Sequence, residues 1–164
     1  SFFEQRFVNE EFDQRACLKR SFRDLAMTRL IDRYVRFHRL RVERVMKDFR
    51  YYRRHYDLKE LAEETSRATS LANQAGEGWL LPAEMIAMLK GGVGNIVCLQ
   101  PFGCLANHII GKGVEKKLKS LYKRLNLLFL DMDPGMSEVN ILNRLHFIVM
   151  SAREGMQTER LVER

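Results

Sequence analysis

The sequence predicts an α/β fold that is preceded by a long-helix N-terminal region. Helix-breaking residues are absent from the first 75 residues, whereas all ten glycines and all three prolines lie between residues 76 and 155. Within that later part, two short apolar runs alternate with segments of helical periodicity. This alternation predicts a parallel strand–helix–strand–helix unit of Rossmann-like type. We expect a basic helical region at 1–56 and an α/β domain with flanking helices at 57–164, packed together as one unit.

The N-terminal region is expected to form one or two long helices over residues 9–56. Two apolar series, offset by one position, follow steps of three and four there. The first series is Leu30, Tyr34, Phe37 and Leu40, and the second is Ile31, Val35, His38, Val42 and Met46. Such a wide apolar face needs contact on more than one side. We therefore expect this region to expose apolar surface or to bury it in a homodimer.

The positive charge of the chain is concentrated in the same region. Residues 1–56 hold 15 Lys/Arg against 8 Asp/Glu, whereas residues 57–164 hold 13 of each. A basic segment attracts nucleic acid or an anionic surface, or packs against an acidic partner. No aromatic–basic recognition signature accompanies it, so nucleic acid is not the expected ligand.

The middle of the sequence holds signals for two helices. Asp57 is a suitable N-cap, with Glu60 three residues later as its capping-box partner, and this helix is expected to run to about Ala75. Pro82 suits the first turn of a second, short helix that two glycines at 91 and 92 close.

The strand–helix–strand–helix unit occupies residues 94–153. Residues 95–100 and 126–131 read as strands, and their continuous apolar character predicts burial on both faces. Val114 and Leu118 mark a helix of roughly ten residues between them. A turn at Asp133-Pro134-Gly135 precedes a helix that runs through Ala152, capped by Asp133 or Ser137.

Parallel strands bring the loops after both of them to one edge of the sheet, where open α/β folds place their sites. The candidate cofactor-binding residues are therefore Cys104, Asn107, His108, Lys112, Asp131 and Asp133, with Ser137 nearby. Asn143 and Arg144 either reach this crevice or form salt bridges. Simpler interpretations also stand: Asp133 orders a turn, and the glycines around Lys112 serve helix entry, since no Walker A pattern is present.

The three cysteines differ in their surroundings. Cys104 follows Gly103 in a loop and is the candidate for chemistry, whereas Cys98 lies in an apolar strand and Cys17 in a helical region, where packing is expected. Uneven spacing makes no disulfide framework, which favours a reducing, cytoplasmic location. No apolar run approaches 18 residues, and the start is typical neither of a signal peptide nor of an initiator, so we expect a piece of a longer protein.

Several motifs between residues 50 and 153 resemble a known family. They are Gly76-Glu77-Gly78-Trp79, Asn95-Ile96-Val97-Cys98-Leu99-Gln100-Pro101-Phe102-Gly103-Cys104-Leu105, Asn107-His108, Gly111-Lys112-Gly113, Asp131, Asp133-Pro134-Gly135, Ser137-Glu138-Val139-Asn140 and Leu142-Asn143-Arg144. This pattern is similar to the C-terminal part of large CoA-substrate-specific enzyme activases, bacterial proteins related to the activator of 2-hydroxyglutaryl-CoA dehydratase. Two positions depart from the family pattern: Ala106 replaces a usual proline, and Met132 a usual tyrosine.

The resemblance implies a role in electron transfer. Full-length family members carry actin-like ATPase modules and an iron–sulfur cluster that passes low-potential electrons to a dehydratase or reductase. Cys104 matches the position of a cluster ligand. The chain itself holds no ATPase module, so we expect a scaffold domain that is not catalytic and binds no cluster by itself, with the remaining domains of the parent protein and a dehydratase or reductase as partners.

Two other functions fit the sequence. In one, the chain is a protein-interaction module that docks an ATPase or partner subunit through its basic helices and has no chemistry of its own. In the other, it is a small enzyme or nucleotide-binding domain that uses Lys112, Asp131 and Asp133.

Overall fold

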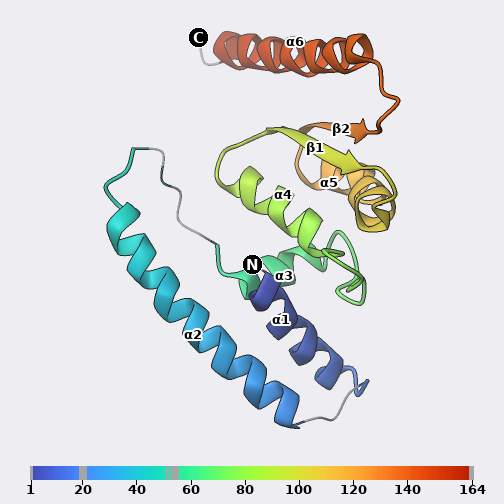
Figure 1. The fold of residues 1–164 in the computed structure, drawn as a ribbon. Helices are drawn as coiled ribbons and strands as arrows, with labels where there is room; N and C mark the ends of the chain where they lie inside the picture. Colours follow the sequence, from blue (N-terminus) through green and yellow to red (C-terminus); the bar gives the residue numbers. More distant parts are fainter. Residues whose placement is uncertain (1, 19–21, 51, 53–55, 163–164) are drawn as a thin grey trace. The chain divides into compact units, whose positions relative to one another are not determined.

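The protein is described here by a computed structural model that covers residues 2–18, 22–50, 52 and 56–162 (Figure 1). Contacts divide the chain into two compact units, Ser1–Ala87 and Met88–Arg164. This division falls later than the change in composition at residue 56, because the first helix after that point packs on the N-terminal helix. No helix in the described ranges combines the length and the apolar character needed to cross a membrane.

The first unit contains the helices α1 (Phe2–Arg15), α2 (Phe22–Met46) and α3 (Leu58–Thr65), and most of α4 (Leu80–Lys90). Helix α1 packs on α2 and on α3. The buried apolar side chains of this unit include Phe7, Val8, Leu25, Leu58, Leu61, Trp79, Ala83 and Ile86. The core is therefore assembled from all four helices, with the indole of Trp79 fully buried.

Helix α1 buries polar side chains as well as apolar ones: Glu4, Gln5, Glu10 and Asp13 are all less than a tenth exposed. Long-range hydrogen bonds connect polar side chains of α1 to the segment before α4. Gln5 donates from Nε2 to the carbonyl oxygens of Gly76 (3.1 Å) and Glu77 (3.3 Å), and Trp79 donates from Nε1 to Oδ1 of Asn9 (2.7 Å). The Gly-Glu-Gly-Trp segment is thus held against a polar face of α1.

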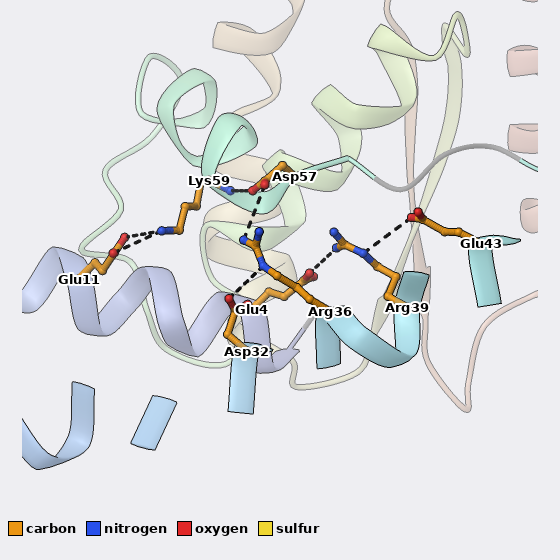
Figure 2. A network of polar contacts seen from close by, with 8 residues as sticks. All are labelled: Glu4, Glu11, Asp32, Arg36, Arg39, Glu43, Asp57 and Lys59. Carbon is orange, nitrogen blue, oxygen red and sulfur yellow. Dashed lines mark hydrogen bonds and ion pairs between the residues drawn. The ribbon is translucent and has the colours of Figure 1, made fainter. Parts of the chain in front are cut away.

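Ion pairs connect α1, α2 and the start of α3 (Figure 2). The residues of this network are Glu4, Glu11, Asp32, Arg36, Arg39, Glu43, Asp57 and Lys59. The pair of Arg39 with Glu4 is the most enclosed, because the Glu4 side chain is only 7% exposed. The pair of Lys59 with Glu11 (3.3 Å) is partly exposed, and pairs of that kind contribute little to stability.

The break between α1 and α2 occurs without glycine or proline. Helix α1 ends at Arg15, and Cys17 adopts a left-handed conformation with a φ of 58°. The N–H of Cys17 bonds to the carbonyl of Gln14 (3.1 Å), and that of Leu18 to the carbonyl of Asp13 (2.8 Å). These two bonds form a Schellman motif, which usually places glycine where Cys17 lies. Cys17 is exposed, so its expected role in packing is wrong.

Replacing Cys17 with glycine should stabilise the first unit. Glycine adopts a positive φ without the steric cost that an L side chain incurs, which is about 1 kcal/mol. We expect the Cys17→Gly protein to unfold at a higher denaturant concentration. Cys17→Ala keeps the β-carbon and should show no such gain; equal gains in both proteins would contradict the conformational explanation.

Helix α3 begins where the sequence predicts, but it ends earlier than predicted. Asp57 caps it by accepting a hydrogen bond from the N–H of Lys59 (2.9 Å), which confirms the predicted N-cap. The helix ends at Thr65 rather than near Ala75. The hydroxyl of Thr65 bonds to the carbonyl of Leu61 (2.6 Å), and such side-chain bonds compete with the backbone ladder. The chain then forms turns up to Trp79, whose N–H bonds to the carbonyl of Asn73 (2.9 Å).

Gly78 is required at the point where these turns meet α4. Its φ is +28°, and a β-carbon there would lie 1.9 Å from the carbonyl oxygen of Asn73. Gly78→Ala should therefore lower the free energy of unfolding by more than about 2 kcal/mol, measured by urea denaturation. Gly113→Ala is the matched control, because a β-carbon at Gly113 meets open space. Equal stability of the two variants would contradict the close approach.

Helix α4 matches the sequence signals. Pro82 lies in its first turn, and Gly92, with a φ of +83°, closes it. The N–H of Val93 bonds to the carbonyl of Met88 (2.9 Å), which completes a second Schellman motif.

The second unit contains two parallel strands, β1 (Asn95–Pro101) and β2 (Asn126–Met132). A π-helix, η1 (Ala106–Gly111), and the helix α5 (Glu115–Leu121) connect them, and α6 (Glu138–Val162) packs on β2. The predicted parallel strand–helix–strand–helix order is confirmed. The sheet has two strands in the described part of the chain, which establishes a small α/β unit, while its Rossmann-like type stays a prediction.

The strands differ from the expectation that both are buried on both faces. Burial alternates along β1: Ile96 and Gln100 are buried, whereas Val97 is 40% exposed and Leu99 is 55% exposed. One face of this strand is therefore uncovered, although its sequence is continuously apolar. Strand β2 is more enclosed because α6 packs on it.

Candidate functional site

The ends of the two strands lie side by side, as parallel pairing requires. Pro101 is in register with Met132, and the N–H of Phe102 bonds to the carbonyl of Met132 (3.2 Å). Gly103, with a φ of +72°, then turns the chain into η1. π-Helical turns are rare and occur often at functional sites. The sequence signals marked a loop and a helix start here, but not a π-helix.

Asn107, on η1, lies between the two cysteines of this unit and is buried. Its Nδ2 donates to Sγ of Cys104 (3.1 Å), and its Oδ1 accepts from the thiol of Cys98 (3.8 Å). Gln100 donates from Nε2 to the backbone carbonyl of Asn107 (3.0 Å) and so fixes η1 against β1. We call Cys98, Gln100, Cys104 and Asn107 the asparagine–cysteine cluster.

The asparagine–cysteine cluster distinguishes its two sulfur atoms. Burial raises the pKa of the Cys98 thiol above its usual value of 9.0, which favours a protonated donor. An amide N–H directed at Sγ of Cys104 stabilises negative charge on that atom. Both cysteines are half-buried, so the expected contrast between a buried Cys98 and an accessible Cys104 is wrong. The difference between them is in hydrogen bonding.

Asp131 lies near an imidazole and two cationic side chains at the same end of the strands. His108 Nδ1 and Lys112 Nζ lie 3.9 and 3.7 Å from its Oδ1, and the Arg144 guanidinium lies 3.9 Å from its Oδ2. We call these four residues the Asp131 cluster. Arg144 also donates to the carbonyl of Phe129 (2.6 Å), which positions it beside β2. The side chains are 35–46% exposed and the distances are long, so these ion pairs contribute little stability.

The expected site residues therefore separate into two clusters. His108 and Lys112 meet Asp131, as parallel pairing predicted, and Arg144 joins them from α6. Cys104 and Asn107 contact each other instead.

Asp133 takes the simpler of its two expected roles. Its Oδ1 accepts from the N–H of Gly135 (3.1 Å), and its backbone carbonyl accepts from the N–H of Met136 (3.0 Å). These bonds order the Asp133-Pro134-Gly135 turn. Ser137 directly precedes α6, and its carbonyl accepts from the N–H of Ile141 (3.2 Å).

Sequence reasoning did not single out Gln100. This side chain is fully buried, and its Oε1 has no hydrogen-bond partner within the described part of the chain. A polar residue inside an apolar strand was the available signal, because buried polar groups normally have a hydrogen-bonding task.

A metal ion would need more ligands than either cluster offers. Among the described residues, no group of three or more His, Cys, Asp or Glu side chains is arranged to hold one. Comparison of the chain with models of protein families, with curated proteins and with solved structures finds no match.

Thiol alkylation can test the assignment within the asparagine–cysteine cluster. In a Cys17→Ser background, Cys104 should react faster than Cys98 near pH 7.5. Thiolate is the reacting form, and the raised pKa of Cys98 keeps that thiol protonated until the pH rises through it. Mass spectrometry of the labelled peptides measures both rates across pH.

The role of Asn107 is tested in the same experiment. Asn107→Leu removes the amide donor and should slow Cys104 severalfold at neutral pH. The matched control is Asn143→Leu, an exposed amide on α6, which should change neither rate. A Cys98 that reacts faster than Cys104 in the parent protein would reverse the assignment.

Proposed function

We propose that this chain is the C-terminal part of an acyl-CoA dehydratase activase-like protein. In this proposal, residues 88–164 form an α/β scaffold domain that supports an iron–sulfur cluster or electron-transfer site in the longer protein. The motifs between residues 50 and 153 support the family relationship. The hydrogen bond from Asn107 to Sγ of Cys104 is the structural observation on which the proposed role of the domain depends.

The surroundings of Cys104 suit a thiolate ligand. Hydrogen bonds to ligand sulfur atoms tune the reduction potential of an iron–sulfur cluster, and residues behind the ligands orient them. Asn107 supplies such a bond, and Gln100 and Cys98 hold Asn107 in place. A bound cluster would supply one-electron transfer, while the protein residues orient the sulfur and stabilise its charge.

The described residues can supply one cysteine ligand to an iron–sulfur cluster, but not a complete set of ligands. Clusters are commonly held by about four cysteine thiolates. Cys104 can serve as one, whereas the Cys98 thiol is directed to Asn107 and its raised pKa disfavours the thiolate. The remaining ligands would come from other parts of the longer protein or from a partner. We accordingly expect the chain alone to purify without a cluster.

Reconstitution with added ligands tests this role. The chain is incubated anaerobically with iron, sulfide and an excess of a small thiol that can supply the missing ligands. Iron should be retained after gel filtration in the parent protein and in Cys17→Ser, and it should be lost in Cys104→Ser. Iron content and visible absorbance are the two measurements.

Cys98→Ser is the second control in this experiment. It should retain iron, because Cys98 acts behind the ligand position. Its stability cost should be of order 1 kcal/mol. Iron that is retained in Cys104→Ser, or absent from the parent protein under these conditions, would contradict the role of Cys104.

A further inference from the structure

Helix α2 carries a row of exposed apolar side chains that we call the α2 stripe: Met27, Leu30, Tyr34, Phe37, Val42 and Val45. Each of them is 57–80% exposed. Their spacing places them along one face of the helix. Leu25 and Thr28 lie on the opposite face and are buried, and α2 packs on α1. This apolar surface is thus exposed within the single chain, and its burial in a homodimer stays a prediction.

Arginines accompany the α2 stripe. Helical spacing places Arg33 and Arg44 beside one of its edges and Arg29 further from the stripe on the same side, and all three are exposed. Arg41 lies within the stripe, with its guanidinium carbon 5.8 Å from the centre of the Phe37 ring. Arg36 and Arg39, on the other side of α2, pair with acidic residues of the first unit, whereas these four make no ion pair among the described residues.

We propose that the α2 stripe binds an amphipathic helix of a partner protein, in which acidic residues flank the apolar seam. An apolar face read at steps of three and four is the usual surface for helix-to-helix recognition. Charges beside such a seam select the partner and its orientation. Arginines on one side of the seam, together with Arg23 and Arg41 inside it, call for carboxylates on one flank of the partner helix and others that face the seam.

Charge decides between this partner and a second copy of the chain. Helix α2 has seven arginines and three acidic residues, a net charge of +4. An antiparallel pair of α2 helices would place the arginine edges against each other, and like charges at that position disfavour pairing. Pairing with an acidic helix is instead favoured, because its carboxylates supply counter-charges to the exposed arginines.

The distribution of charge also disfavours a lipid surface. Helices that lie in a membrane interface carry basic residues across their polar face, on both sides of the apolar one. Here the polar side opposite the α2 stripe is occupied by contacts with α1. The exposed arginines lie within the stripe, at Arg23 and Arg41, or on one side of it. This inference concerns the first unit and does not depend on the role of Cys104 in the second.

Two synthetic helical peptides of equal length can test the proposal. Both carry leucine at the seam, with glutamate flanks in one and lysine flanks in the other. Fluorescence anisotropy of labelled peptides should show that the chain binds the glutamate peptide at least about tenfold more tightly than the lysine peptide. Added salt should weaken this binding.

Variants locate the binding to the α2 stripe. Phe37→Ser should weaken binding of the glutamate peptide by about tenfold or more, and the matched control Phe102→Ser, at an exposed phenylalanine of the second unit, should not. The triple change Arg29→Glu, Arg33→Glu and Arg44→Glu should reverse the preference toward the lysine peptide. Circular dichroism confirms that each variant keeps its helix content.

Three results would overturn the proposal. The first is failure of the glutamate peptide to bind, or equal affinity for both peptides. The second is a dimer in sedimentation experiments that Phe37→Ser dissociates, which would make a second copy the occupant. The third is binding to phosphatidylserine vesicles that the glutamate peptide does not compete with, which would make a lipid surface the occupant.

Discussion

The parallel pairing of β1 and β2 is the constraint on which the second unit depends. Parallel strands cannot be joined by a tight turn, so the chain must cross over between them. The crossover consists of η1 and α5, and it delivers the residues that follow β1 to the same edge as those that follow β2. The Asp131 cluster is a consequence of strand direction, because its members come from separate parts of the sequence. The asparagine–cysteine cluster forms within β1 and the segment that directly follows it.

The two clusters at that edge have opposite physical characters. The asparagine–cysteine cluster is enclosed and held by directional hydrogen bonds, so the position of each atom in it is well specified. The Asp131 cluster is partly exposed, with charges at longer distances, and solvent screens it. An enclosed amide can set the protonation of a sulfur atom, whereas the exposed charges mainly set the local field. We therefore assign chemistry that depends on precise geometry to the asparagine–cysteine cluster.

Local signals in the sequence predicted the elements that local physics controls. The two strands follow from short apolar runs. The cap of α3 follows from Asp57, and the turn that closes α4 follows from Gly92. The proximity of His108 and Lys112 to Asp131 was also predictable, because it needs only the strand direction. Two helix ends were not. Cys17 adopts a conformation that glycine usually takes, and Thr65 ends α3 where the apolar pattern continues.

Contacts between distant parts of the chain were beyond sequence reasoning. The bond between Trp79 and Asn9 joins residues 70 positions apart, and neither residue type identifies its partner. The burial of the polar face of α1 was not predictable for the same reason. Gln5 is buried because a loop 71 residues later in the sequence covers it. The exposure of Leu99 was likewise hidden, since an apolar residue in a strand predicts burial whether or not a neighbouring element supplies cover.

A sheet of two strands has a consequence for how this unit associates. Each strand pairs on one side only among the described residues, so each leaves a row of backbone N–H and C=O groups at its outer edge. Such rows are templates for strand addition, and neither edge carries a proline before the last residue of β1. A segment of extended chain could continue the sheet without disturbing the loops at its carboxyl end. The same open edges make the unit prone to aggregation when it is concentrated alone, which favours handling it dilute or with the chain that completes the sheet.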